Sequence, residues 1–223
     1  RPVIRGAIRA GDVAHVDGGR PGTGRWGGGR HDGEMAAIGV FCGSSSGSDP
    51  VFAEAATALG STLAAGGHRL VYGGGHVGLM GVVADAVLAG GGGVTGVMTE
   101  QLVAAEVAHL GLTELEITSS MHARKARMAE LSDGVIVLPG GFGTLDEAFE
   151  MVTWNQLGLV AAPVVFLDVA AYFAPLFDFI EGTVAAEFVS PANAALARRA
   201  STVGEAVRLA IAAPEAFTPK WLG

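Results

Sequence analysis

The chain has 223 residues, a net charge of −8 and a single cysteine, Cys42. This length fits one domain, and a lone cysteine excludes an internal disulfide framework and fits a reducing cytosol. The acidic balance argues against a nucleic-acid surface, because phosphate backbones are bound by clustered cations. No stretch approaches the ~20 consecutive apolar residues of a membrane span. We therefore expect a cytoplasmic protein that binds neither nucleic acid nor membranes.

Ten glycines and six arginines fall within residues 1–34, which show almost no apolar periodicity. Such a segment buries too little surface to offset the entropy lost on ordering. We predict that residues 1–34 form a disordered Gly/Arg-rich extension, either a tail or a segment upstream of a functional start at Met35. Residues 35–223 are predicted to form one domain.

From residue 37 onward, short apolar runs alternate with helical patterns. The expected strands are Ala37–Phe41, Arg69–Tyr72, Gly93–Met98, Thr113–Ile117, Gly134–Leu138 and Ala162–Leu167, with a weaker one near Ala197–Thr202. The expected helices are Pro50–Ala65, Gly78–Ala89, Ser119–Leu131, Thr144–Leu157, Tyr172–Ala186 and Val203–Ala212. Continuous apolar strands are typical of a parallel sheet covered on both faces. The alternation predicts an α/β fold: a single-domain, Rossmann-like, doubly wound parallel sheet with helices on both faces.

In such sheets ligands bind outside the carboxyl ends of the strands, so the turns that follow the strands are the candidate sites. The first turn, Cys42–Ser48, contains Gly43 and Ser44, whose small size lets backbone N–H groups approach a phosphate or a base. It is equally well an ordinary polar turn in which Ser48 or Asp49 caps the next helix. Cys42 itself is expected to be a buried small hydrophobe rather than a nucleophile.

The second turn, Gly73–Gly78, formally matches the pattern G-x-G-x-x-G, and Glu100 stands where a ribose-binding acid is expected. These features support a competing hypothesis, a dinucleotide-dependent enzyme. The match is weak, because a chain with 35 glycines produces it easily and because it follows the second strand rather than the first.

Three of the eight Lys and Arg residues that follow residue 34 fall within positions 124–127. Ser119 or Ser120 can cap the helix that begins here, which leaves N–H groups free for an anion. Arg124 offers a planar fork that suits phosphate or carboxylate, and Lys125 offers a point charge. We favour an anion site over a solvated basic helix face, because cations are scarce elsewhere.

The neighbouring Arg127 is assigned a structural role. It lies one turn further along the helix, within reach of Glu130 or Asp133, and is expected to pair with one of them.

The most specific turn is Pro139–Glu147, which joins an apolar strand to an amphipathic helix. Its three glycines allow backbone amides to close around an anion at the helix N-terminus. Thr144 can cap the helix and donate its hydroxyl to an oxygen ligand. No Gly-Lys-Ser/Thr follows, so this turn is not a P-loop for triphosphate transfer. The turn predicts a phosphate cradle, and the cation cluster at Arg124 narrows this to a monophosphate site.

Glu147 lies one turn into that helix. A carboxylate beside a phosphate is repelled unless an arginine balances it, which suits a catalytic glutamate near Arg124. The alternative is an acid that merely complements the helix dipole, a role that fits Asp146 better.

The motif Met121-His122-x-Arg124-Lys125, followed by Pro139-Gly140-Gly141-x-Gly143-Thr144-x-x-Glu147, resembles the LOG family of cytokinin riboside 5′-monophosphate phosphoribohydrolases, often called lysine decarboxylases. The similarity spans roughly residues 36–212 and includes the segments Tyr72–Gly81, Thr153–Gly158 and Phe188–Pro191. It implies a nucleotide-binding catalytic domain at 35–223 that hydrolyses the N-glycosidic bond of N6-modified adenosine 5′-monophosphates, or of AMP. The implied products are the free base and ribose 5-phosphate. The resemblance also implies that the enzyme uses no metal or organic cofactor and forms a homodimer.

By position in these motifs, Arg124 and Glu147 would be catalytic. The resemblance implies further substrate contacts from Glu106, Lys125, Gly140, Gly141, Phe142, Gly143, Thr144 and Thr153, and the first two turns add Gly43, Ser44, Gly74 and Gly75. Ribosyl C–N cleavage passes through an oxocarbenium-like transition state, as glycoside hydrolysis does. One carboxylate can stabilise that cation and orient or deprotonate water. The family usually has Ile-Pro-Lys where this chain has Met98-Thr99-Glu100, which leaves the preferred base open.

Two other functions compete with hydrolysis. A pyridoxal-phosphate decarboxylase needs a Schiff-base lysine, and the chain offers only Lys125 and Lys220, so this function is rejected. A non-catalytic nucleotide or small-molecule carrier keeps the pocket without the chemistry, but gains nothing from an acid at Glu147. Apolar helices such as Gly78–Ala89 are the candidate contacts of the dimer.

Overall fold

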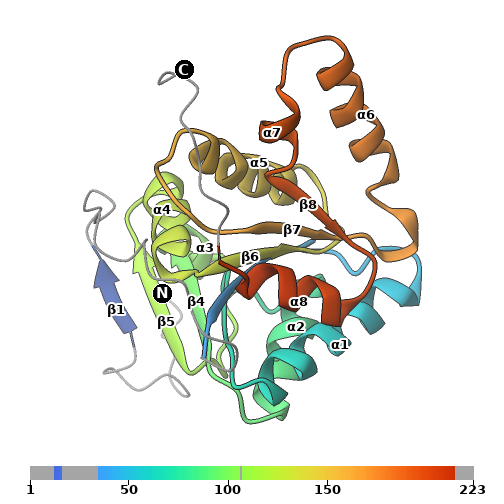
Figure 1. Ribbon diagram of the computed structural model, residues 1–223. Helices are drawn as coiled ribbons and strands as arrows, with labels where there is room; N and C mark the ends of the chain where they lie inside the picture. Colours follow the sequence, from blue (N-terminus) through green and yellow to red (C-terminus); the bar gives the residue numbers. More distant parts are fainter. Residues whose placement is uncertain (1–12, 17–34, 106, 214–223) are drawn as a thin grey trace.

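A single parallel sheet organises the computed structural model, which describes residues 13–16, 35–105 and 107–213. The strands in these residues lie in the order β1-β5-β4-β3-β2-β6-β7-β8, and every pairing is parallel (Figure 1). They are β1 (Val13–Val16), β2 (Ala37–Phe41), β3 (Arg69–Tyr72), β4 (Val94–Thr99), β5 (Glu114–Thr118), β6 (Gly134–Val137), β7 (Val164–Leu167) and β8 (Ala197–Ala200). The predicted Rossmann-like, doubly wound sheet is confirmed.

Helices cover both faces of this sheet. The helical segments are α1 (Pro50–Ala65), α2 (Gly78–Ala89), α3 (Glu100–Ala104), α4 (Met121–Leu131), α5 (Phe142–Gln156), η1 (Val169–Ala171), α6 (Ala174–Ala185), α7 (Pro191–Ala194) and α8 (Val203–Ile211). Side chains of α1, α2 and α8 form the core on one face, and those of α4, α5 and α6 pack on the other. Of these helices, only α3, α7 and η1, all short, were not predicted from the sequence.

The central strands are apolar along their whole length because both of their faces are buried. In β6, Val135 and Val137 join the core beside α4 and α5, whereas Ile136 joins the core beneath α1, α2 and α8. The period-2 alternation of a strand therefore sends successive side chains into different cores, and a continuous apolar run results. No helix among the described residues has the length and apolarity needed to cross a membrane.

The strand order reverses at β2, which lies between β3 and β6. Val40 of β2 is in register with Tyr72 of β3 on one side and Ile136 of β6 on the other. The carboxyl ends of these three strands therefore meet at one edge of the sheet. Such a reversal is where ligands bind in open α/β sheets.

Helix α5 begins at Phe142, two residues before the predicted start at Thr144. Gly141 is its N-cap in an extended conformation, and no side chain caps the helix. The predicted cap at Thr144 is therefore wrong, because this residue lies inside the first turn and is buried there. The other capping predictions are resolved in favour of Asp49 for α1 and Ser120 for α4.

Strand β1 falls within the segment predicted to be disordered. Residues 13–16 pair with β5 in parallel register, so the prediction does not hold for these four residues. The open edge of β5 presents unpaired backbone groups that can accept any extended segment, and composition alone does not reveal such an addition. The rest of residues 1–34 lies outside the described residues, and its disorder stays a prediction.

Candidate active site

Three turns come together at the reversal of the sheet. Gly43, after β2, donates its N–H to the Pro139 carbonyl after β6 at 3.0 Å. The Gly43 carbonyl in turn accepts from the Leu79 N–H of α2 at 3.0 Å. Gly78 has a positive φ of 59°, and a side chain there would overlap the backbone of Ser44. These turns pack backbone against backbone, which explains their glycines.

Arg124 is a buried cation at the edge of this cluster. Ser120 caps α4 by accepting from the Ala123 N–H at 3.1 Å, and this starts the helix that carries Arg124. The Arg124 Nε donates to the Val97 carbonyl of β4 at 2.8 Å, and its Nη1 donates to the Glu147 Oε1 at 3.0 Å. Protein oxygens therefore accept hydrogen bonds from two of the three guanidinium nitrogens, Nε and Nη1, and hold the group in place.

Gly73 provides the space that the guanidinium occupies. A Cβ at this position would overlap the Nη2 of Arg124, and its other near contact, the Met80 sulfur, is at an ordinary distance of 3.5 Å. The first glycine of the Gly73–Gly78 turn is thus required by Arg124.

Glu147 projects from the second turn of α5, and its carboxylate meets Arg124 from a different helix. The side chains of Arg124 and Glu147 are 7% and 16% exposed, so the pair is largely removed from water. Burial raises the pKa of the Glu147 carboxyl above its usual range, and the charge of Arg124 opposes this rise. Since Glu147 lies beyond the first turn, it is not an acid that complements the start of the helix.

Lys125 is bound by two carboxylates of α5. Its Nζ lies 3.1 Å from the Asp146 Oδ2 and 3.0 Å from the Glu150 Oε2. Burial lowers the pKa of Lys125, but hydrogen bonds to Glu150 and Asp146 outweigh it, so the pKa is raised overall. A Schiff-base lysine needs the opposite, a lowered pKa and a free amine. Thr153 lies on α5, three residues beyond Glu150, and is exposed.

The start of α5 is open to a ligand. Gly141 and Gly143 have nothing within 4 Å of the place where a Cβ would stand, whereas Gly140 is packed against Thr144 and Gly43. Phe142 is 94% exposed. Because the first N–H groups of a helix have no partner inside it, this end of α5 can bind an anion.

The Gly73–Gly78 turn is covered by the loop before β5. The His76 N–H donates to the Val107 carbonyl at 3.0 Å, and the Gly74 carbonyl accepts from His109 at 2.8 Å. Gly75 forms an antiparallel bridge with Ala108. The N–H of His76 that a pyrophosphate would need is therefore occupied, which disfavours the dinucleotide hypothesis.

Two residues beside the site can be compared with their predicted roles. Arg127 pairs with Glu130 at 3.1 Å as predicted, but its stronger partner is Glu116 of β5, which no prediction included. Asp133 instead accepts from the Ala37 N–H at 2.8 Å. Cys42 is buried as predicted, and burial raises the pKa of its thiol, which opposes nucleophilic reactivity.

The other predicted site residues divide into those that lie together at the sheet reversal and those that do not. The structure brings together Arg124, Lys125, Glu147 and the two glycine turns that hold Gly43 and Gly140. Ser44 is exposed, and Gly74 and Gly75 are buried beneath the covering loop. Glu106 lies outside the described residues. Among the described residues, no group of three or more His, Cys, Asp or Glu side chains is placed to hold a metal ion.

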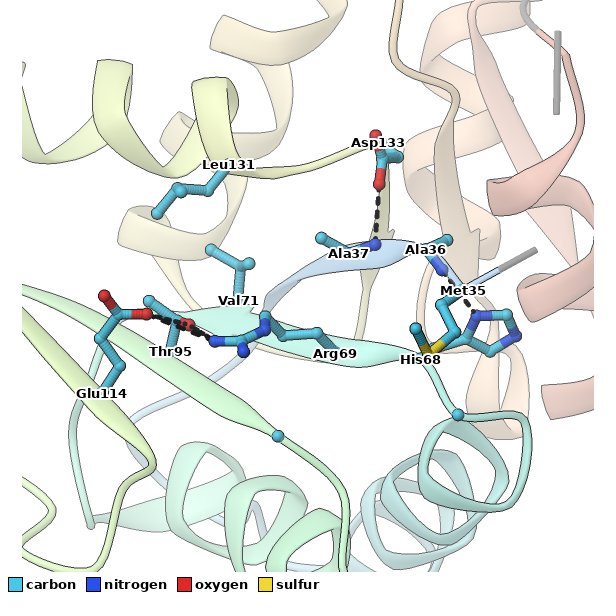
Figure 2. A pocket seen from close by; sticks show the side chains of 12 residues that line it. Met35, Ala36, Ala37, His68, Arg69, Val71, Thr95, Glu114, Leu131 and Asp133 are labelled. Atoms are coloured by element: carbon cyan, nitrogen blue, oxygen red, sulfur yellow. Dashed lines mark hydrogen bonds and ion pairs between the residues drawn. The ribbon is translucent and has the colours of Figure 1, made fainter.

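A cavity of about 490 Å³ lies elsewhere, at the amino ends of the strands (Figure 2). Its lining includes Arg69, whose Nη1 donates hydrogen bonds to the Thr95 Oγ1 at 2.8 Å and to the Glu114 Oε2 at 3.3 Å. None of the predicted site residues lines it. It stands at the edge of the sheet opposite to the one where such folds bind ligands.

Comparison with known proteins connects this geometry to a family. Residues 80–210 match the family described as "possible lysine decarboxylase". A protein of Oryza sativa subsp. japonica named "probable cytokinin riboside 5′-monophosphate phosphoribohydrolase" is 47% identical over 157 residues, which cover 70% of this chain and 70% of its own. The chain belongs to the possible lysine decarboxylase family. A protein of Rhodococcoides fascians named "cytokinin riboside 5′-monophosphate phosphoribohydrolase" is 46% identical over 158 residues, or 70% of this chain and 80% of its own.

Solved structures of low identity share the fold. The molybdenum cofactor binding protein of Rippkaea orientalis superposes with a TM-score of 0.60 at 23% identity, over 79% of this chain and 95% of its own. The molybdenum cofactor carrier protein of Chlamydomonas reinhardtii gives a TM-score of 0.59 at 20% identity, over 78% of this chain and 94% of its own. The family therefore shares its architecture with proteins of different function, and function must be argued from the site.

Proposed function

We propose that this protein hydrolyses the N-glycosidic bond of a nucleoside 5′-monophosphate, releasing the free base and ribose 5-phosphate. The substrates are N6-modified adenosine monophosphates of the cytokinin riboside class, with plain AMP as the alternative. The names of the relatives at 45–47% identity support this activity. The observation that carries the proposal is the buried Arg124–Glu147 pair, which lies beside the open, glycine-rich start of α5.

Glu147 supplies the chemistry in this proposal. As the bond between C1′ and the base nitrogen breaks, the ribosyl ring gains positive charge, which the nearby carboxylate stabilises. The same carboxylate orients the attacking water and accepts its proton, so that the water oxygen bonds to C1′. The base leaves with a proton supplied by solvent, and Glu147 returns the proton taken from the attacking water to solvent. A raised pKa makes Glu147 a better proton acceptor than an ordinary glutamate.

Arg124 holds Glu147 in place. Its Nε and Nη1 are bound to Val97 and Glu147, which supports a positioning role over an anchor for the phosphate. The phosphate is assigned to the backbone N–H groups of residues 140–144 at the start of α5. Further contacts with the substrate are proposed for the remaining candidates from the sequence: Lys125, Thr153, Gly43, Ser44, Gly74, Gly75 and Glu106.

The competing function is a non-catalytic carrier, and the shared fold of cofactor carrier proteins keeps it open. A buried carboxylate near a phosphate site weakens anion binding, so a pure carrier gains nothing from Glu147. Incubation with isopentenyladenosine 5′-monophosphate and with AMP, followed by chromatography of the free base, decides between them. We expect release of base from at least one nucleotide. Binding of both without release would support the carrier.

We also propose that the enzyme acts in the cytoplasm as a homodimer, without nucleic acid or membrane as partner. Leu79, Val83 and Val87 of the predicted contact helix α2 are buried in the core, so a dimer contact through α2 would use its partly buried residues Met80, Val82 and Leu88. Phe179 and Phe188, which are exposed and lie outside the site, are further candidates. Light scattering coupled to gel filtration should give twice the chain mass, and a monomer at micromolar concentration would contradict the dimer.

A further inference from the structure

Tyr172 lies outside every motif that the sequence analysis singled out, yet its side chain reaches the glycine turn of the site. Its hydroxyl donates to the carbonyl oxygen of Gly140 at 2.7 Å. The two residues are 32 positions apart, and Tyr172 follows the short helix η1 after β7. The contact therefore joins the segment after β7 to the turn after β6.

An unusual backbone delivers Tyr172 to this place. Ala170 and Ala171 have φ values of 51° and 57°, in the left-handed region that residues with a Cβ rarely adopt. Asp168 fixes the far side of the turn by accepting from the Phe173 N–H at 2.7 Å. Strained conformations of this kind persist where the surrounding structure holds them, and they gather at functional sites.

The ring of Tyr172 is packed from two sides. It makes edge contacts with Phe52 of α1, at 5.7 Å between ring centroids, and with Phe173, at 5.0 Å. These contacts restrict the orientation of the ring, and the residue is 44% exposed on its remaining side. The hydroxyl therefore approaches Gly140 from a set direction.

The consequence for the turn follows from the planar peptide unit. In a trans peptide, the carbonyl of Gly140 and the N–H of Gly141 point in opposite directions. Fixing the carbonyl on the side of Tyr172 therefore turns the Gly141 N–H to the other side. Gly141 is the N-cap of α5, where N–H groups are free to bind an anion.

We propose that Tyr172 is a positioning residue, whose hydroxyl holds the Gly140 carbonyl so that the Gly141 N–H faces the phosphate of the substrate. This inference rests on the proposed assignment of the phosphate to the start of α5. Tyr172 does not take part in the bond cleavage, so its role concerns binding of the phosphoribosyl group rather than the chemical step.

The test is the variant Tyr172→Phe, which removes the hydroxyl and keeps the ring between Phe52 and Phe173. The dissociation constant of ribose 5-phosphate, measured by calorimetry, should rise by roughly three- to tenfold, the range that one net hydrogen bond gives. With nucleotide substrate, KM should rise by a similar factor while kcat stays within about twofold of wild type.

Tyr72→Phe is the matched control, because it removes the only other tyrosine hydroxyl of the chain and leaves the turn untouched. It should bind ribose 5-phosphate like wild type. An unchanged dissociation constant in Tyr172→Phe, whether or not kcat or the melting temperature falls, would overturn the inference. If wild type binds ribose 5-phosphate but hydrolyses no nucleotide, the proposed function fails and the binding comparison still decides on Tyr172. If wild type does not bind ribose 5-phosphate, the inference fails too.

Discussion

Arg124 of α4 and Glu147 of α5 meet at 3.0 Å, with both side chains largely withdrawn from water. Removing two charges from water is costly, so a buried ion pair is weak evidence for a stabilising role. Perturbed carboxylates with a specific charge partner gather at functional sites instead. The pair is better explained by what it does to Glu147, namely to hold an ionised carboxylate in a place where burial disfavours it.

Gly73→Ala should disturb this pair without disturbing the fold. The new Cβ would overlap only the Nη2 end of Arg124, the far end of a long side chain, so the guanidinium is displaced and its hydrogen bond to Glu147 is weakened. Because Arg124 opposes the rise in the Glu147 pKa, its displacement raises that pKa further. The acidic limb of the pH profile of kcat/KM should shift to higher pH, and kcat/KM at neutral pH should fall by about tenfold or more.

The control for this variant is Gly182→Ala, at an exposed glycine of α6 with nothing within 4 Å of the new Cβ. It should keep the wild-type pH profile. An acidic limb that stays in place in Gly73→Ala, or moves to lower pH, would show that Arg124 does not hold the Glu147 carboxylate.

Arg127 should behave as a structural arginine on the same helix. It bonds Glu116 through Nε at 2.6 Å and through Nη2 at 2.9 Å, and the Glu116 side chain is only 4% exposed. Arg127→Ala leaves this buried carboxylate without its partner, so the free energy of unfolding in urea should fall by about 3–5 kcal/mol. Arg69→Ala, which breaks the exposed pair with Glu114, should cost about 0–1 kcal/mol. Equal losses in the two variants would refute this assignment.

Tyr72→Phe should stabilise the protein. The Tyr72 hydroxyl is buried and has no hydrogen-bond partner among the described residues. Burying a hydroxyl without a partner is unfavourable, so its removal should raise the free energy of unfolding by about 1–3 kcal/mol. Thermal and urea unfolding measure this directly. A loss of stability would mean that the hydroxyl has a partner.

The turns of the candidate site could be predicted from the sequence because the patterns that mark them are local. Strand β6 and the glycines after it indicate a turn at the carboxyl edge of a parallel sheet, and that edge also receives the start of α4. The strands before α4 and α5 both end at this edge, but β4, β3 and β2 lie between them, and α4 packs across these three strands to bring Arg124 to Glu147.

Three features were not predicted from the sequence, because no local pattern marks the geometry on which each depends. Tyr172 reaches Gly140 through two alanines in the left-handed region, where sequence patterns lead one to expect glycine or asparagine. Glu116 stands on a strand eleven residues before Arg127, and only the crossover from β5 to α4 brings the two together. Strand β1 depends on the open edge of β5, which the composition of residues 1–34 does not reveal.

The measurement that tests the central claim most directly is a single-turnover reaction of Glu147→Gln with bound isopentenyladenosine 5′-monophosphate. The glutamine keeps the shape of the side chain but can neither stabilise the ribosyl cation nor accept a proton. Wild type and the control Glu130→Gln, which alters a carboxylate paired with Arg127 outside the site, should release free base and ribose 5-phosphate. Glu147→Gln should bind the nucleotide and lower the cleavage rate by about a thousandfold or more. Cleavage by Glu147→Gln at the wild-type rate would contradict the account.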